Sequence, residues 1–310
     1  MPRWSTPPLT PAQKKLRKKE YDRQRKLNRA AVRAEVRPQQ LIETSTMQAP
    51  LERPTVGLKI KGPRHGLKVA VLTDAQVRRD VPITHLAACG RYLTEIRPDV
   101  ILCIGDFADM PSLSTYTAPG SLDSEGLRYE DDIAATKAGM HAFLKPIRAV
   151  RGYAPKLILT YGNHEDRITR TRALNPRTFT GTLDDLGYEA AGWATYPFLQ
   201  PVVINGVAFC HYFPSGVMGR PITTAAVLLR KLHMSAFAGH QQGRDIAYAR
   251  RADGSSLTAI ISGSFYQHNE EYLSPLTNKH WRGFYVLNQV KDGMFDEMAI
   301  SVVYLLRKFT

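Results

Sequence analysis

Residues 100–109 read Val-Ile-Leu-Cys-Ile-Gly-Asp-Phe-Ala-Asp, and residues 157–165 read Leu-Ile-Leu-Thr-Tyr-Gly-Asn-His-Glu. Each stretch places a short apolar run directly before a glycine and then before acidic, amide or imidazole side chains. Short apolar runs are typical of strands that are buried on both faces of a parallel sheet. The two stretches therefore predict buried strands whose carboxyl ends carry chemically reactive side chains.

Similar apolar runs occur along the chain, and helical patterns separate them. The principal strand candidates are Leu67–Thr73, Val100–Ile104, Leu157–Tyr161, Val202–Cys210 and Ala236–Ala238. Amphipathic segments predict helices around 82–97, 130–150 and 222–233. This alternation predicts a βαβαβ order and an α/β fold with parallel strands. Strands dominate after about residue 192, and Lys291-Asp292-Gly293 predicts a terminal hairpin between 284–290 and 298–305.

Positive charge is concentrated at the start of the chain. The 310 residues include 42 Lys and Arg and 28 Asp and Glu, which gives a net charge of +14. Residues 1–40 contain 12 of the Lys and Arg but only 3 of the Asp and Glu. The uninterrupted run from Thr10 to Val36 predicts a basic helix with a thin apolar face. Composition alone leaves a solvated extension and a nucleic-acid-binding arm equally open. A membrane-surface helix is disfavoured because large apolar residues are sparse.

The sequence suggests three parts. We expect a basic helical tail over 1–40, a linker over 41–65 and a folded domain over 66–310. No apolar stretch suits a membrane-spanning helix or a secretory signal. The three cysteines lie in apolar or small-residue runs, as reduced core thiols do. We therefore expect a soluble cytoplasmic protein that does not bind membranes.

Each principal apolar run ends in side chains that bind metals. The stretches are Asp74-Ala-Gln76, Gly105-Asp106-Phe-Ala-Asp109, Gly162-Asn163-His164-Glu165, His211 and Gly239-His240-Gln-Gln242. Loops beyond the carboxyl ends of parallel strands converge, so residues far apart in sequence meet there. Carboxylate and amide oxygens mixed with imidazole nitrogens suit divalent ions such as manganese, iron, zinc or magnesium.

In this order the motifs resemble those of the calcineurin-like metallophosphoesterases, whose signature is D-x-H, G-D-x-x-D/N, G-N-H-D/E, a lone His and G-H-x-H. The match covers residues 67–243. Residues 110–116 and 265–283 also resemble members carried by bacteriophages, which would place the protein in the host cytoplasm. The resemblance implies a four-layer sandwich of two mixed β-sheets flanked by helices. It also implies hydrolysis of phosphoester bonds by a hydroxide that bridges two divalent metals, most favourably Mn²⁺.

The resemblance also implies a role for each motif residue. Its metal ligands are Asp106 as the bridge, Asp74, Gln76 and Gln242 at the first metal, and Asn163, His211 and His240 at the second. In catalysis, His164 stabilises the transition state or protonates the leaving oxygen, and Asp109 buttresses the loops of Asp106 and His164. Arg167, just after the G-N-H-E turn, and His268 are candidates for substrate contact. Both are equally compatible with surface positions.

Gln76 and Gln242 depart from the family pattern, which has a histidine at each position. An amide oxygen is a neutral, weak and hard donor. The first site is therefore predicted to bind metal less tightly and to favour manganese or magnesium. We favour a retuned site over a decayed one because the remaining ligands are present.

Three functions are compatible with these motifs. We favour a phosphodiesterase or nuclease acting on nucleic acid or a nucleotide, with residues 1–40 attracting phosphates. A protein phosphoserine/threonine phosphatase shares the metal centre, but its G-D-x-V-D-R-G pattern is not matched at Asp109-Met110-Pro111. The third function is a non-enzymatic nucleic-acid-binding or assembly protein. Aromatic residues near the motif loops that could stack on a base are Tyr116, Tyr212, Phe213, Phe265 and Tyr266.

Overall fold

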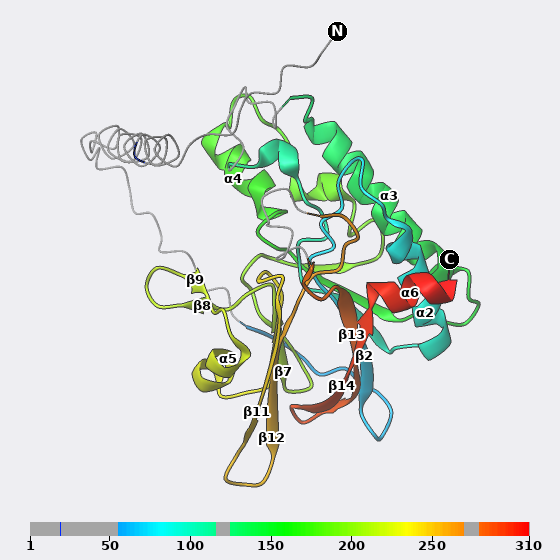
Figure 1. Cartoon of the computed structure of the whole chain (residues 1–310), viewed down its shortest axis with the longest axis vertical. Coiled ribbons are helices and arrows are strands. Elements are labelled where there is room, and N and C mark those ends of the chain that lie inside the picture. The colour runs from blue at the N-terminus through cyan, green and yellow to red at the C-terminus, as the bar shows by residue number, and fades with distance from the viewer. Residues whose placement is uncertain (1–18, 20–54, 116–124, 270–278, 310) are drawn as a thin grey trace, which may run out of the picture. The chain divides into compact units, whose positions relative to one another are not determined.

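The computed structural model describes residue 19 and residues 55–115, 125–269 and 279–309. Residues Arg53–Thr310 form one compact unit, which contains two six-stranded sheets (Figure 1). The basic helix expected over 10–36 lies outside the described residues, except for Lys19.

The first sheet carries the early strands of the predicted βαβαβ order. Its spatial order is β14 (Met294–Ser301), β13 (Gly283–Lys291), β2 (Leu67–Leu72), β3 (Val100–Cys103), β4 (Lys156–Thr160) and β5 (Ala194–Tyr196). Strands β2 to β5 run parallel, while β13 pairs antiparallel with both β2 and β14. The predicted parallel strands are confirmed.

The second sheet is also mixed. Its spatial order is β1 (Val56–Leu58), β6 (Val202–Ile204), β7 (Val207–Cys210), β10 (Ala236–Ala238), β12 (Ser256–Ser262) and β11 (Arg244–Arg250). Strands β7, β10 and β12 run parallel, and β11 closes the sheet as an antiparallel neighbour of β12. Two short strands, β8 (Pro214–Ser215) and β9 (Arg220–Pro221), pair only with each other among the described strands.

Helices cover the outer faces of both sheets. They are α2 (Thr84–Ile96), α3 (Tyr129–Arg148), α4 (Asp166–Leu174), α5 (Ala225–Leu232) and α6 (Val302–Phe309), with 3-10 turns at Pro111–Leu113 and Leu183–Leu186. Figure 1 shows α2 and α6 outside the first sheet and α5 outside the second. Within the described ranges, every helix is too short or too polar to cross a membrane.

Three apolar clusters hold the layers together. The central cluster joins the two sheets, with Leu102 and Ile158 from the first sheet facing Phe209 and Ile260 from the second. One outer cluster packs α2 and α3 on the first sheet, and the other packs α5 on the second. Burying each large apolar side chain contributes about 1.5–3 kcal/mol to the stability of the fold. The order helix, sheet, sheet, helix confirms the predicted four-layer α/β sandwich.

Three predicted elements differ in detail. The run 202–210 is a hairpin of β6 and β7 rather than one strand, because Asn205 and Gly206 both adopt positive φ, as a tight hairpin turn requires. Strand β14 ends at Ser301, and the expected strand residues 302–305 instead begin α6, whose Val302 and Leu305 are buried three positions apart. Part of the expected linker, Val56–Leu58, forms β1 because it pairs with β6.

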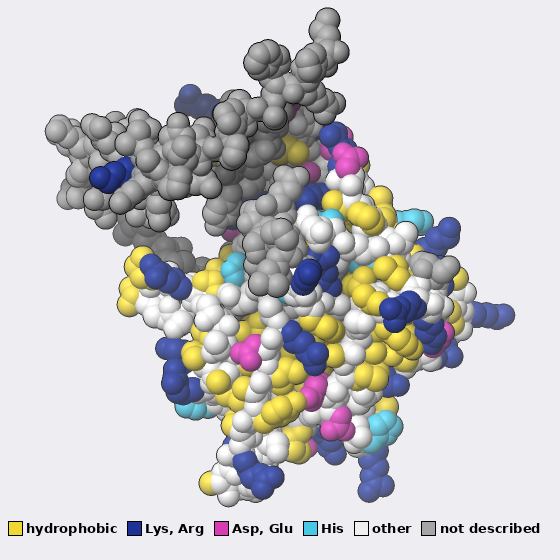
Figure 2. Space-filling view, viewed as in Figure 1, with side chains coloured by type: hydrophobic (Ala, Val, Ile, Leu, Met, Phe, Trp, Pro, Cys, Tyr) yellow, Lys and Arg dark blue, Asp and Glu magenta, His cyan; other side chains and the backbone are white. Residues whose placement is uncertain are grey.

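The visible surface of the described chain carries scattered positive charge. In Figure 2, Lys and Arg side chains are spread among apolar and neutral polar groups and do not form one continuous stripe. A nucleic-acid-binding face usually gathers its basic residues in a patch or along a helix. On the face shown, the folded unit therefore has no obvious track for a polyanion.

Candidate metal centre

Loops from both sheets carry the candidate ligands. Asp74, Asp106 and Asn163 follow β2, β3 and β4, which are parallel neighbours in the first sheet. His211 and His240 follow β7 and β10, which are parallel neighbours in the second. Because parallel neighbours end at the same edge of a sheet, each set of side chains emerges together.

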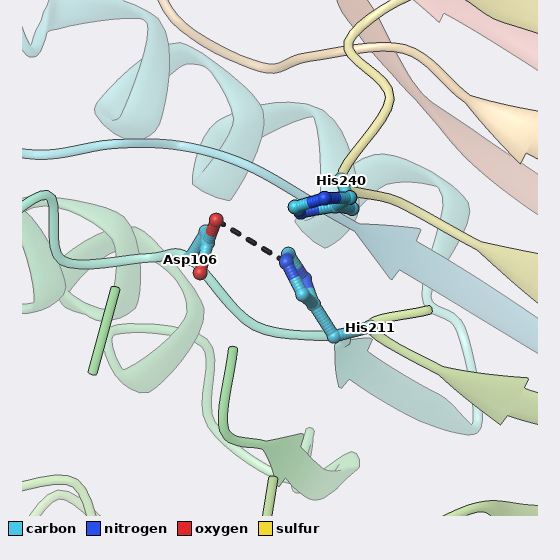
Figure 3. Close-up of side chains that lie close together, drawn as sticks. All are labelled: Asp106, His211 and His240. Atoms are coloured by element: carbon cyan, nitrogen blue, oxygen red, sulfur yellow. Dashed lines mark ion pairs between the residues drawn. The ribbon is translucent and has the colours of Figure 1, made fainter. Parts of the chain in front are cut away.

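Four of these side chains meet at one point, which we call the donor cluster: Asp106, Asn163, His211 and His240. A carboxylate oxygen of Asp106 and one ring nitrogen each of His211 and His240 lie within 4.8 Å of one another (Figure 3). His211 Nε2 is 3.2 Å from Asp106 Oδ2. Asn163 Oδ1 lies 2.8 Å from His211 Nε2 and 2.7 Å from His240 Nδ1. The predicted bridge and the predicted second-site residues are thus brought together.

The main-chain contact of His211 indicates which of its ring nitrogens faces the donor cluster. Its Nδ1 lies 3.0 Å from the carbonyl oxygen of Ile104, so we assign a proton to Nδ1, and Nε2 faces Asn163 and Asp106. A ring nitrogen, an amide oxygen and a carboxylate oxygen then point at one another. Such electron-pair donors repel unless a cation, either a proton or a metal ion, lies among them. Mixed nitrogen and oxygen donors of this kind suit a divalent metal.

Asp106 dominates the electrostatics of the donor cluster. Burial acts to raise the pKa of Asp106, but His164 and His211 hold it well below its usual range. Burial acts to lower the pKa of His211, yet the Asp106 carboxylate reverses this effect and raises it to about 9. Burial lowers the pKa of His240 to about 4, and His211 contributes in the same direction. A metal cation would therefore replace a proton on His211, whereas His240 is already neutral.

The predicted first site offers oxygen donors. Asp74 is fully buried, and burial raises the pKa of its carboxyl group to about 7. Its Oδ2 accepts a hydrogen bond from the His240 N–H at 3.0 Å. Gln76 is 2% exposed, and among the described residues its Oε1 has no hydrogen-bond partner. A buried amide oxygen without a partner is costly, and a metal ion would supply the missing partner.

A hydrogen-bond network holds the side chain of Gln242. Its Oε1 accepts a hydrogen bond from Tyr266 Oη at 2.9 Å. Tyr266 Oη is also 3.3 Å from His280 Nε2, which lies 2.7 Å from Ser264 Oγ. The convergence of Gln76 and Gln242 on one metal stays a prediction.

The ligand loops have strained backbones. Five candidate ligands adopt left-handed φ: Asp74 at 48°, Gln76 at 43°, Asp106 at 51°, His240 at 67° and Gln242 at 55°. This conformation costs a residue with a side chain about 1–3 kcal/mol and is concentrated at functional sites. Two motif glycines allow the close approach, because a Cβ added at Gly162 would collide with Asp106 Oδ1 and one at Gly239 with Asp74 Oδ2.

His164 lies beside the donor cluster and is oriented by Asp109. Its Nδ1 is 2.8 Å from both the carbonyl oxygen and Oδ1 of Asp109, so Nδ1 carries a proton. Its Nε2 lies 3.6 Å from Asp106 Oδ2. Burial acts to lower the pKa of His164, but Asp106 and Asp109 reverse the effect and raise it. Asp109 thus contacts the His164 ring at Nδ1, while Nε2 faces Asp106 and Arg167.

The two predicted substrate contacts occupy different surroundings. Arg167 is 9% exposed, and its Nη1 donates hydrogen bonds to the carbonyl oxygens of Asp109 at 2.8 Å and Met110 at 3.1 Å. Its Nη2 lies 3.3 Å from His164 Nε2. His268 stacks on Tyr266, the residue that donates to Gln242, with ring centroids 4.4 Å apart. Contact of either residue with a substrate stays a prediction.

Glu165 has a structural role that its residue type and position in the sequence do not reveal. Its Oε2 accepts hydrogen bonds from the N–H groups of Asp106 and Gly162, each at 2.9 Å. Its Oε1 accepts from the Ala108 N–H at 3.0 Å and from Tyr188 Oη at 3.2 Å. One buried carboxylate thus fastens the loop after β3 to the loop after β4. The only sequence signal is its place as the last residue of G-N-H-E.

Comparisons with known proteins leave the family open. No family model matches the chain, and no curated protein matches it. Its solved structural neighbours include a conserved uncharacterized protein of Streptococcus pneumoniae TIGR4 described as a predicted phosphoesterase, at 11% identity, 76% coverage of this chain, 98% of the other and a TM-score of 0.27.

Two further neighbours are a mutant cold-active protein tyrosine phosphatase and GAP50 of Plasmodium, described as the anchor in the inner membrane complex. The phosphatase is 14% identical, covers 84% of this chain and 88% of its own, and has a TM-score of 0.34. GAP50 is 12% identical, the match covers 76% of this chain and 84% of the GAP50 chain, and the TM-score is 0.28. With TM-scores below 0.5, these similarities carry no argument about function.

Proposed function

We propose that this protein is a metal-dependent phosphoesterase that hydrolyses phosphoester bonds at the donor cluster. The observation that carries the proposal is the meeting of Asp106, Asn163, His211 and His240, with His164 held beside them by Asp109. The order of the motifs supports the same function through the resemblance described above. Two divalent ions, most favourably Mn²⁺, are proposed as cofactors.

The residues of the chain would divide the work. Asp106, Asn163, His211 and His240 would hold one ion, and Asp74, Gln76 and Gln242 would hold the other together with Asp106. Divalent ions bound there would polarise a phosphoryl oxygen and lower the pKa of a water molecule. His164 would give a proton from Nε2 to the leaving oxygen while Asp109 keeps its ring oriented. Arg167 adds positive charge 3.3 Å from the His164 ring.

The proposal is tested by incubating the protein with Mn²⁺ and four substrates: bis-p-nitrophenyl phosphate, p-nitrophenyl phosphate, single-stranded DNA and duplex DNA. We expect metal-dependent hydrolysis that a chelator abolishes, and faster hydrolysis of diesters than of the monoester. Bound metal without turnover of any substrate would instead support a binding or assembly protein. Exclusive turnover of a phosphoserine peptide added to the panel would support a protein phosphatase.

His164→Ala is expected to lower turnover about a hundredfold while leaving bound metal nearly unchanged. General acid catalysis typically contributes 10²–10⁴-fold, and His164 lies outside the donor cluster. Metal analysis and single-turnover rates measure the two effects separately. If the variant turns over as fast as the wild-type protein, water and not His164 protonates the leaving oxygen.

The basic tail is proposed to bind nucleic acid through residues 1–40. Replacing its 12 Lys and Arg by Gln is expected to weaken DNA binding and to flatten its dependence on salt. The reason is that each phosphate contact releases counterions, with a slope of about −0.9 per contact on duplex DNA. Fluorescence anisotropy at several salt concentrations measures this, and hydrolysis of the small diester serves as the control. Unchanged affinity at low salt would remove nucleic acid as the partner of the tail.

The double change Gln76→His and Gln242→His is expected to raise zinc affinity at the first site about tenfold or more. Imidazole nitrogen is a stronger ligand for zinc than an amide oxygen. The two single changes should be non-additive because both residues would serve one ion. Calorimetric metal titrations of the four proteins test this. Two equally tight sites in the wild-type protein, or strictly additive effects, would contradict the shared site.

A further inference from the structure

Five aromatic residues near the motif loops were candidates for stacking on a base, and the structure separates them. Phe213 is 4% exposed, and Phe265 and Tyr266 are completely buried. These three rings belong to the interior and offer no face to a ligand. Tyr116 lies outside the described residues. Tyr212 is the remaining candidate, and it is partly exposed.

Tyr212 lies directly against the donor cluster. It follows His211 in the chain, and its ring centroid is 4.8 Å from that of His240 and 5.9 Å from that of His211. Phe198, also partly exposed, meets Tyr212 edge-on with centroids 5.5 Å apart. Phe198 comes from the segment after β5 in the first sheet, whereas Tyr212 follows β7 in the second. The two sheets therefore place an aromatic pair at the rim of the donor cluster.

A guanidinium group lies in the same neighbourhood. The side chain of Arg170 is 55% exposed and forms an ion pair with Asp166 at 3.3 Å. Its Nη2 also donates a hydrogen bond to the carbonyl oxygen of Asn163 at 3.1 Å. The Asn163 side chain in turn contacts His240, against which the Tyr212 ring packs. An exposed cation and a partly exposed ring thus each contact a residue of the donor cluster.

We infer that Tyr212, supported by Phe198, is a nucleobase subsite of the donor cluster, with Arg170 beside Asn163 as a phosphate contact. This inference rests on the proposed phosphoesterase function and deepens it by naming the substrate class. A nucleobase would stack on Tyr212 while its phosphate lies at the donor cluster within reach of Arg170. Stacking suits this position because every base has a π-face, and a tyrosine ring loses little conformational freedom on binding. The subsite selects nucleotide esters over alkyl phosphoesters.

The test compares binding of dAMP with binding of 2-deoxyribose 5-phosphate, which has the same phosphate and sugar without a base. The full chain is loaded with Mn²⁺, and affinities are measured by calorimetry. We expect dAMP to bind about tenfold more tightly or better, as base–aromatic stacking predicts. Tyr212→Leu should abolish the difference, Tyr212→Phe should keep it, and Phe198→Leu should reduce it. Tyr248→Leu, at a 66% exposed tyrosine on β11, is the matched control and should bind both compounds as the wild-type protein does.

Several outcomes would overturn the inference while leaving the proposed function intact. Equal affinity of the metal-loaded protein for the two phosphates is one, and an unchanged preference in Tyr212→Leu with full metal content is another. If Tyr212→Leu loses metal, the decision passes to Phe198→Leu, whose unchanged preference would overturn the inference. If phosphotyrosine binds as tightly as dAMP, with the same dependence on Tyr212, the group that the subsite recognises would be a phenol ring and not a nucleobase. Failure of the wild-type protein to bind metal or either phosphate would instead refute the proposed function.

Discussion

Asp106→Asn is expected to remove metal from the donor cluster and to lower phosphoesterase activity about a thousandfold. The carboxylate of Asp106 is the only negative charge within the donor cluster, where it lies 3.2 Å from His211 Nε2. Loss of metal would forfeit several kcal/mol of charge stabilisation in the transition state, and about 4 kcal/mol corresponds to a factor of 10³. Metal content by atomic absorption and initial rates on the small diester measure the two effects.

A second readout of Asp106→Asn does not depend on activity. The Asp106 carboxylate raises the pKa of His211 in spite of its burial, so neutralising residue 106 should lower that pKa. Titration of the His211 ring by NMR in metal-free protein measures the change. Asp253→Asn is the matched control, since Asp253 is an exposed aspartate. Among the described residues, Ser255 alone donates hydrogen bonds to its carboxylate. If Asp106→Asn had the metal content, the rates and the His211 pKa of the wild-type protein, the active centre would lie elsewhere.

Most of the fold could be predicted because its central strands are short and consist mainly of apolar residues. Strands β2, β3, β4 and β10 lie within one residue of their predicted positions, since continuous apolar runs bounded by polar loops are typical of buried parallel strands. The hairpin of β6 and β7 was missed although Asn205-Gly206 is a strong turn signal. Both of its strands are short and apolar, so periodicity could not distinguish two strands from one.

The limits of prediction at the candidate site are physical. Asp106, Asn163, His211 and His240 could be predicted to converge because each follows a parallel strand of its sheet. Contacts between side chains of different loops have no such signal. The chain cannot reveal in advance that Tyr212 lies against His240 while neighbouring aromatic residues are buried, because burial depends on how the two sheets pack together.

Glu165 illustrates the same limit most clearly. Its position after His164 suggests chemistry, yet in the structure the carboxylate accepts four hydrogen bonds within the protein and is completely buried. Three of the donors are backbone N–H groups, and any residue type except proline could supply them. A sequence pattern records side chains, so a contact made to the backbone of a distant loop leaves no trace in it.

Glu165→Ala is therefore expected to destabilise the folded unit strongly. Removal of the carboxylate leaves the N–H groups of Asp106, Ala108 and Gly162 and the hydroxyl of Tyr188 without their acceptor. A buried donor that loses its partner costs about 1–3 kcal/mol, so we expect the free energy of unfolding to fall by about 4 kcal/mol or more. At about 2–4 °C per kcal/mol, this corresponds to a decrease in Tm of about 10 °C.

Urea unfolding of metal-free proteins measures the effect of Glu165→Ala without any contribution from metal binding. Glu189→Ala is the matched control, because Glu189 is exposed and its carboxylate accepts a hydrogen bond from Thr195 Oγ1 at 2.6 Å at the protein surface. That variant should stay within about 0.5 kcal/mol of the wild-type protein. Glu165→Gln keeps an acceptor oxygen but turns an amide N–H₂ toward donors. Its loss in free energy of unfolding should therefore lie between the losses of Glu165→Ala and Glu189→Ala. A loss below about 1 kcal/mol in Glu165→Ala would mean that the loops after β3 and β4 are held in place without this carboxylate.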